Sequence, residues 1–225
     1  MNSRAKEVLA PLATLSFAAS SLLVIRYVVF GSFTFWYLDW NLFLAWLPLV
    51  FAWLLVRYVK KHPWVSWQGI GLSLLWIGFL PNSFYIVTDF MHLQEVGQHT
   101  LLFDAVLLFL FTVAGYAIGF TSVFMVHRLL LTRINRPSAT RVIAGVFFAC
   151  SFAIYLGRFL RWNTWDVLMN PAGLILDVTD RIVNPVAHEQ TFWVTILFFV
   201  LLCSLYFILQ WFLAAAERTN SLRKL

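Results

Sequence analysis

The sequence predicts an all-α membrane protein, a polytopic bundle of six transmembrane helices. Of its 225 residues, 61% are hydrophobic and only 12% are charged, whereas soluble domains carry about 25% charged residues. Six segments are apolar over the roughly 20 residues that a helix needs to cross a bilayer. The chain also holds 11 Trp and 23 Phe, residues that suit lipid-facing and interfacial surfaces.

The six segments follow one another along the chain, and no polar stretch between them is long enough for a second domain. We therefore expect a single transmembrane domain over residues 1–225. The first segment resembles a signal peptide, but its apolar run continues to Phe30 and is long enough to remain as an uncleaved anchor. The predicted spans are Val8–Phe30, Asn41–Val59, Trp67–Thr88, Leu101–Val126, Val142–Leu160 and Thr191–Ala216.

The distribution of charge predicts the orientation of these spans. Most Lys and Arg residues lie at the two termini and in the second and fourth loops. Basic loops stay in the cytoplasm, so we expect both termini there. The net charge of +6 does not indicate nucleic-acid binding, because it is divided among short loops between spans. Of the 10 acidic residues only Glu7 and Glu217 fall on the basic side, which indicates polar chemistry at the outer face.

One group of polar residues follows Pro81, within the stretch LPNSFYIVTDFMHL at residues 80–93. Four of them are spaced three, four and three residues apart, which on a helix gives a single polar stripe. The stripe consists of Asn82, Tyr85, Asp89 and His92. Asp104 enters the next span from the same side, so we take Asp89, His92 and Asp104 as candidate catalytic residues.

A second group lies in the stretch YLGRFLRWNTWDV at residues 155–167. We expect it to bind substrate at the outer membrane interface, together with residues at the same depth in the first and third spans and at the start of the second. The candidate binding residues are Arg158, Arg161, Trp162, Asn163, Asp166, Asn82, Tyr85, Arg26 and Asn41.

Ionised side chains are costly within a bilayer, and three interpretations of these residues remain open. In the first, Arg26, Arg158 and Arg161 neutralise the acids Asp89, Asp104 and Asp166 and only hold helices together. In the second, the arginines bind the phosphate of a lipid headgroup or lipid-linked substrate, with Asp89 and His92 as general base or acid. In the third, Asp89, His92 and Asp104 bind a divalent metal, although no Cys/His cluster or metal motif supports that. We expect no other cofactor.

Small residues predict close helix packing at two places. Gly145, Ala149, Ala153 and Gly157 form a narrow groove along one face of the fifth span, and Gly115 and Gly119 repeat the spacing in the fourth. Packing within one chain is the expected use, and a homodimer through the face of Gly145, Ala149, Ala153 and Gly157 is the alternative.

The longest loop, residues 161–190, predicts a short amphipathic helix on the outer membrane surface. Asn170 and Pro171 have the character of an N-cap and a first helical residue. Apolar residues then recur on one face and Asp177, Asp180 and Arg181 lie opposite. The apolar residues are Leu174, Ile175, Val178 and Ile182.

The two polar stretches, together with NLFLAWLPL at residues 41–49, resemble the bacterial membrane family catalogued as domain of unknown function 1361. The resemblance covers nearly the whole chain. It implies a multi-pass protein of the bacterial cytoplasmic (plasma) membrane, and it supplies no catalytic residue, substrate or cofactor. Three function classes remain open: an enzyme or binding protein for an anionic membrane lipid or lipid-linked molecule, a small-solute or ion transporter, and an accessory protein whose charges only pair helices.

Overall fold

A computed structural model of the protein describes residues 3–162 and 164–222, and all regular secondary structure in these ranges is helical. Six helical segments are long and apolar enough to cross a membrane. The predicted all-α class and the number of candidate spans are thus confirmed. The contacts divide the chain into two compact units, Met1–Asn135 and Arg136–Leu225, which are described separately. The expected single domain stays a prediction.

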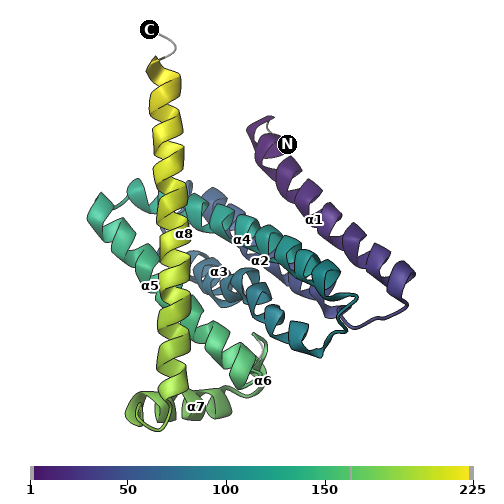
Figure 1. The fold of residues 1–225 in the computed structure, drawn as a ribbon. Coiled ribbons are helices and arrows are strands. Elements are labelled where there is room, and N and C mark those ends of the chain that lie inside the picture. Colours follow the sequence, from purple (N-terminus) through teal and green to yellow (C-terminus); the bar gives the residue numbers. More distant parts are fainter. Residues whose placement is uncertain (1–2, 163, 223–225) are drawn as a thin grey trace. The chain divides into compact units, whose positions relative to one another are not determined.

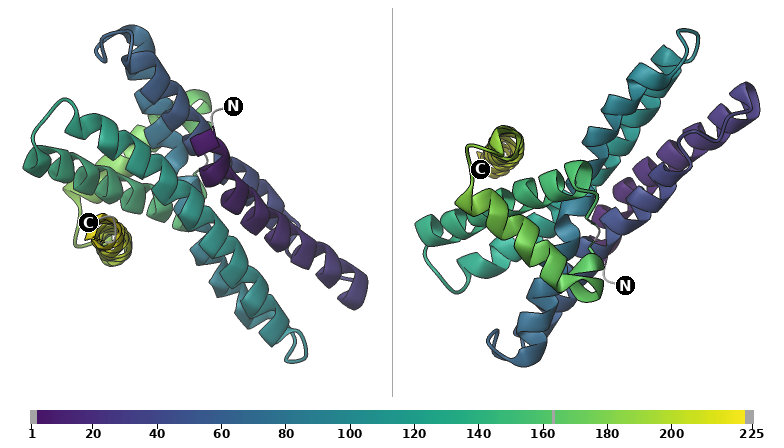
Figure 2. Two further views of the ribbon diagram at one scale, coloured as in Figure 1. Left: turned by 90° about the horizontal axis from the view of Figure 1, so that it is seen from above. Right: turned by 90° about the horizontal axis from the view of Figure 1, so that it is seen from below.

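The first unit is built around one central helix, α4. It packs against α1, α2, α3 and η1, and α2 also packs against α3; Figures 1 and 2 show α1 and α2 running along α4. The elements are α1 (Ser3–Phe30), α2 (Tyr37–Val59), α3 (Trp67–Tyr85), the 3-10 helix η1 (Ile86–Glu95) and α4 (Leu101–Leu131).

The third span differs from its prediction. The α-helix ends at Tyr85, and the chain continues as the 3-10 helix η1. The hydroxyl of Thr88 donates a hydrogen bond to the Tyr85 carbonyl oxygen at 2.7 Å, a local contact that competes with regular helical bonding. A 3-10 helix has three residues per turn, so the polar residues on either side of Tyr85 no longer form one straight stripe.

Two glycines of α4 allow α3 to approach closely. A Cβ atom at Gly115 would lie 2.6 Å from the carbonyl oxygen of Ser83, and one at Gly119 would lie 2.9 Å from the ring of Phe84. The hydroxyl of Ser83 in turn donates to the Ala45 carbonyl of α2 at 3.1 Å. The close packing predicted for Gly115 and Gly119 therefore occurs within the first unit.

The second unit consists of two long helices joined by two short ones: α5 (Arg136–Phe159), α6 (Asp166–Met169), α7 (Pro171–Val183) and α8 (Glu189–Leu222). Helices α5 and α8 pack together through ring pairs such as Phe147–Tyr206, whose centroids are 5.2 Å apart. Gly145 and Ala149 are exposed, and a Cβ at Gly145 would meet nothing within 4 Å. The homodimer face stays a prediction.

Helix α7 begins as the sequence predicts. The side chain of Asn170 accepts a hydrogen bond from the backbone N–H of Gly173 at 3.1 Å, and Pro171 is the first helical residue. No residue of α7, which is described throughout, is buried. Its apolar residues Ile175, Leu176 and Ile182 are each more than 60% exposed, so this helix offers an uncovered apolar surface.

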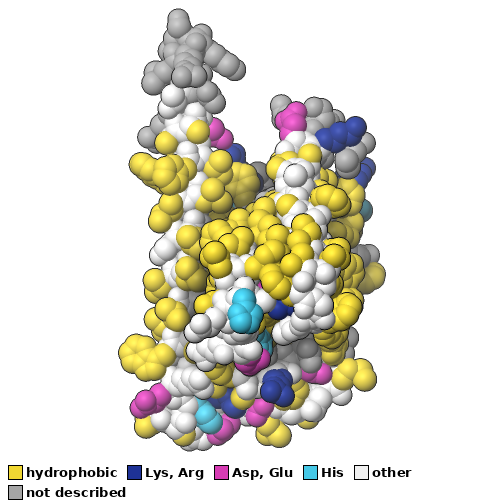
Figure 3. Space-filling view, turned by 45° about the vertical axis from the view of Figure 1, so that its right-hand side comes forward, with side chains coloured by type: hydrophobic (Ala, Val, Ile, Leu, Met, Phe, Trp, Pro, Cys, Tyr) yellow, Lys and Arg dark blue, Asp and Glu magenta, His cyan; other side chains and the backbone are white. Residues whose placement is uncertain are grey.

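The surfaces of the long helices are apolar. In the view of Figure 3, hydrophobic side chains cover the middle stretches, and charged side chains lie mostly toward the ends. In the most hydrophobic windows of α1 and α8 only 17% of residues are buried. Such faces are stable only against lipid or another apolar partner.

Candidate functional site

A buried ion pair in the first unit joins α1 to α4. The Nε atom of Arg26 donates to Asp104 Oδ1 at 2.5 Å and Nη2 donates to Oδ2 at 3.1 Å. Both side chains are buried, at 3% and 0% exposure. Nη1 of Arg26 also donates to the Ser32 carbonyl, and the guanidinium lies 4.7 Å from the centroid of the Phe35 ring. This bidentate pair supports mutual neutralisation for these two residues.

A second polar contact lies between α2 and η1. Asp89 is buried, with 1% exposure, and Asn41 Nδ2 donates to its Oδ2 atom at 3.3 Å. Next to this contact, Ser20 of α1 donates to Asp39 of α2 at 2.6 Å. The start of α2 is thus linked to α1 and η1 by side-chain hydrogen bonds.

The other three residues of the predicted stripe, Asn82, Tyr85 and His92, differ in their contacts and burial. Asn82 donates to the Phe79 carbonyl of its own helix at 3.0 Å, and Tyr85 is half-buried. His92 lies 3.5 Å from Glu95 and packs edge-on against the Tyr37 ring. The structure therefore brings Asn41 to Asp89 and Arg26 to Asp104. The contacts described for Asn82 and His92 are those with Phe79, Glu95 and Tyr37.

A metal site needs several ligands that converge on one point. Among the described residues no group of three or more His, Cys, Asp and Glu side chains could hold a metal ion. Both oxygens of Asp104 already accept from Arg26. Asp89, His92 and Asp104 do not form such a group in the described part of the chain.

In the second unit, Asp177 of α7 accepts hydrogen bonds from two residues, Trp162 and Arg181. Trp162 Nε1 donates to Asp177 Oδ2 at 2.8 Å, and Arg181 Nη1 donates to the Asp177 carbonyl at 2.8 Å. Arg181 also lies 3.5 Å from Asp177 Oδ1 and is 10% exposed. Its Nε atom is buried and has no hydrogen-bond acceptor among the described residues. Helix α7 is thereby tied to the segment that leaves α5.

Arg161 occupies an unusual backbone position in this segment. The Leu156 carbonyl accepts from the N–H groups of both Leu160 and Trp162, each at 3.2 Å, which closes the end of α5. Arg161 has φ of 59°, the left-handed conformation that glycine usually adopts at helix ends. Its side chain is exposed and forms no hydrogen bond or ion pair with the residues that the structure describes.

Three further candidate residues lie near this end of α5. Arg158 and Asp166 are half-buried and both have interaction partners. Asn163 lies outside the described residues. Of the predicted arginines in the second unit, Arg161 is therefore the one with a guanidinium left unpaired in the described structure.

A clasp joins the end of α7 to the loop before α8. Asp180 accepts hydrogen bonds from Asn184 Nδ2 at 2.8 Å and from His188 at 2.7 Å. These two bonds hold the pKa of the Asp180 carboxyl below its ordinary value of 3.8. The ionised form of Asp180 is therefore the form that the clasp stabilises.

The clasp should be lost in acid. A carboxyl whose pKa is lowered in the folded state contributes its stability above the ordinary pKa, and loses it as the pH falls through the lowered value. We expect pepsin to cut residues 184–188 much faster once the pH is well below 3.8. In Asp180→Asn, the rate of pepsin cleavage at residues 184–188 should show no such increase as the pH falls. An equal increase in both proteins would contradict the stabilising role of ionised Asp180.

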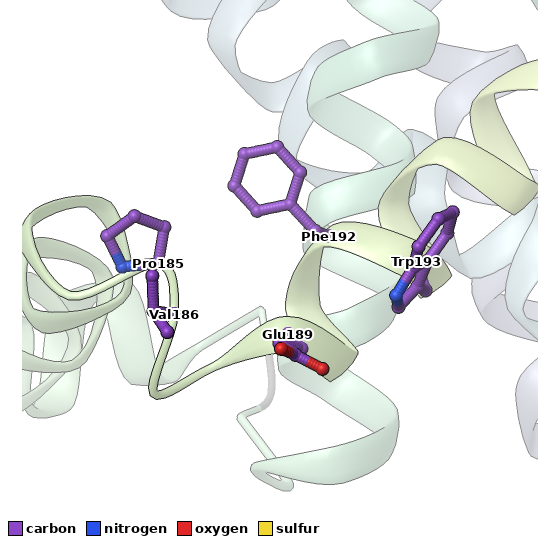
Figure 4. Close-up of a pocket in the computed structure, with 5 residues that line it drawn as sticks. All are labelled: Pro185, Val186, Glu189, Phe192 and Trp193. Carbon is purple, nitrogen blue, oxygen red and sulfur yellow. The ribbon is translucent and has the colours of Figure 1, made fainter.

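An open groove follows the clasp. Phe192 and Trp193 project from the first turns of α8, and Pro185 and Val186 lie in the preceding loop, around Glu189 (Figure 4). Its walls are mainly apolar and aromatic. A groove of this composition can accommodate part of an acyl chain.

Some of these residues were not singled out by the sequence. The role of Asp177 follows from its pairing with Trp162, which lies 15 residues away; its place on the polar face of a predicted helix was the available signal. Asp180, Asn184 and His188 are spaced four apart, a helical spacing that could have indicated the clasp. No sequence signal marks the conformation of Arg161.

The fold and these contacts define a helical protein with six candidate membrane spans. It has a buried ion pair in one unit, and in the other an exposed arginine, Arg161, without a hydrogen bond or ion pair among the described residues. Residues 40–205 match the model of the family described as "Protein of unknown function (DUF1361)", so the chain belongs to that family. Neither the curated proteins nor the solved structures contain a match.

Proposed function

We propose that this protein binds an anionic headgroup, of a lipid or a lipid-linked molecule, on the outer leaflet of the bacterial cytoplasmic membrane. The observation that carries the proposal is the left-handed backbone conformation of Arg161, whose side chain is exposed. A left-handed conformation costs a non-glycine residue about 1–2 kcal/mol, and such strain is often found at functional sites. A glycine would relieve the strain, so backbone stability does not explain an arginine at this position. Binding of a ligand by its guanidinium group would explain it.

The surroundings of Arg161 suit a phosphate at the depth of the headgroups. Trp162 and Trp165 follow it in the sequence, and Trp side chains prefer the membrane interface. The buried Nε–H of Arg181, next to the Trp162–Asp177 contact, also lacks an acceptor among the described residues. A phosphate oxygen, directly or through a water molecule, would satisfy this donor.

The orientation is part of the proposal. The basic loops favour cytoplasmic termini, which assigns α6 and α7 to the outer side. Because α7 lies between two candidate spans and exposes its apolar residues, we infer that it lies in the outer interface. The aromatic groove at the start of α8 would then receive an acyl chain beside the bound headgroup.

Arg161→Gly should weaken lipid binding without lowering the stability of the protein. We expect the full-length protein to be as stable as the wild type or about 1 kcal/mol more stable, because glycine adopts this conformation without strain. Binding of phosphatidylglycerol or a polyprenyl phosphate should weaken about tenfold or more, since a charged hydrogen bond is lost. Native mass spectrometry of the protein released from nanodiscs measures the bound lipid.

Two further variants control this result. Arg161→Lys keeps the charge and should retain part of the binding, whereas Arg141→Gln removes another exposed arginine of the second unit and should leave binding unchanged. Equal losses of lipid binding in Arg161→Gly and Arg141→Gln would show a general effect of charge and would contradict the proposal. Unchanged lipid binding in Arg161→Gly would do the same.

An accessory role is the second candidate for the first unit. The bidentate and buried contact of Arg26 with Asp104 supports it, since these charges satisfy each other.

A further inference from the structure

The end of the first unit opposite to the Arg26–Asp104 pair is rich in positive charge. We call it the basic end; its residues are Arg57, Lys60, Lys61, Arg128 and Arg133. All five side chains are exposed. The two chain segments that form this end, residues 40–88 and 105–135, contain no Asp or Glu. The charge is therefore not balanced within these segments.

One hydrogen bond holds the two parts of the basic end together. Arg133 Nη2 donates to the Val59 carbonyl oxygen at 2.9 Å, across 74 residues of sequence. Val59 is the last residue of α2, where backbone carbonyls lack helical partners and favour a cation. The bond ties the turn that carries Lys60 and Lys61 to the end of α4.

Two of the three arginines at this end lie on aromatic rings. The Arg57 guanidinium is 4.5 Å from the centroid of Trp53, and that of Arg128 is 4.9 Å from Phe124. Each pair belongs to a single helix, with the ring one turn deeper than the charge. Aromatic rings beneath snorkelling cations are typical of the boundary between acyl chains and headgroups.

The lysines are the groups that can still bind a ligand. The side chains of Lys60 and Lys61 form no hydrogen bond or ion pair with the described residues. Exposed Trp67 follows them at the start of α3, with 79% exposure. Lys60 and Lys61, without acidic partners among the described residues and bordered by aromatic rings at the end of membrane helices, have the features that recognise anionic phospholipids.

We propose that the basic end binds anionic phospholipid headgroups in the leaflet that it faces, which is the cytoplasmic leaflet if the basic loops lie inside. Lys60 and Lys61 contact the phosphate, Arg57 and Arg128 extend the positive surface, and Arg133 is the positioning residue. A soluble phosphate would share the charge contacts. The aromatic rings favour the lipid, because they suit its glycerol and acyl regions.

The test uses the full-length protein in nanodiscs of phosphatidylcholine with a minor fraction of photo-crosslinkable phosphatidylglycerol. We expect crosslinks in peptides from residues 57–67 and 124–133, and a loss of roughly tenfold in the triple variant Arg57→Gln, Lys60→Gln, Lys61→Gln. The crosslinks should also weaken at high salt. The yield near Arg161 reports the outer site separately, so each proposal can fail without the other.

A matched triple variant, Lys6→Gln, Arg136→Gln, Arg141→Gln, removes three other basic charges and should leave the crosslinks at the basic end in place. Arg133→Gln should reduce them although Lys60 and Lys61 remain. Equal losses in the two triple variants would overturn the proposal, because general charge would then explain binding. Full competition by inorganic phosphate would overturn the choice of a lipid.

Discussion

Asp104→Ala should cost the first unit about 3–5 kcal/mol of unfolding free energy, the loss expected when one partner of a buried ion pair is removed. The Arg26 guanidinium is 3% exposed and would lose both acceptors on Asp104, while only the Ser32 carbonyl remained. Reversible denaturation of the full-length protein in mixed micelles, followed by Trp fluorescence, measures the change.

A double variant tests whether the cost comes from the unpaired charge. Arg26→Met with Asp104→Leu replaces both charges by apolar groups, which is often neutral or stabilising for a buried pair. We expect it to recover most of the stability lost in Asp104→Ala, giving a large coupling energy. Additive losses in Arg26→Met, Asp104→Leu and the double variant would show that the two residues act independently.

Gly115→Ala should destabilise the packing of α3 on α4 by about 1–3 kcal/mol, the usual cost of overpacking a close contact. The added Cβ would lie 2.6 Å from the Ser83 carbonyl oxygen and 2.9 Å from Ile86 Cδ1. The first of these atoms belongs to the backbone, so α3 itself must move. The same denaturation assay measures the loss.

Gly78→Ala is the matched control, because a Cβ at Gly78 on α3 meets nothing within 4 Å. Alanine favours helix over glycine by about 1 kcal/mol, so this variant should be neutral or more stable. If Gly78→Ala and Gly115→Ala have the same effect, the close approach of α3 to α4 at Gly115 is incorrect.

The spans were predictable because hydropathy is a local property of the sequence. The positions of the six helices and the N-cap of α7 at Asn170 follow from composition and residue type over short windows. The change from α-helix to 3-10 helix after Tyr85 was not predicted. It coincides with a side-chain contact of Thr88 that leaves no mark on the hydrophobic pattern.

The pairing of charges could be predicted only as a set of alternatives. Three arginines and three acids lay at similar predicted depths, and any pairing among them was compatible with the sequence. The partner of Arg26 is 78 residues away, so the choice of Asp104 depends on how α1 packs against α4. The left-handed backbone of Arg161 likewise results from the two bonds to the Leu156 carbonyl, which no residue pattern specifies.

The most direct test of the proposed function is an experimental structure of the wild-type protein in nanodiscs with its native lipids retained. The account predicts phosphate density within hydrogen-bonding distance of the Arg161 guanidinium, with an acyl chain directed toward the groove of Phe192 and Trp193. Arg161→Gly should lack that density and keep the same fold. An Arg161 side chain paired with a protein carboxylate, with no lipid phosphate beside it, would contradict the account.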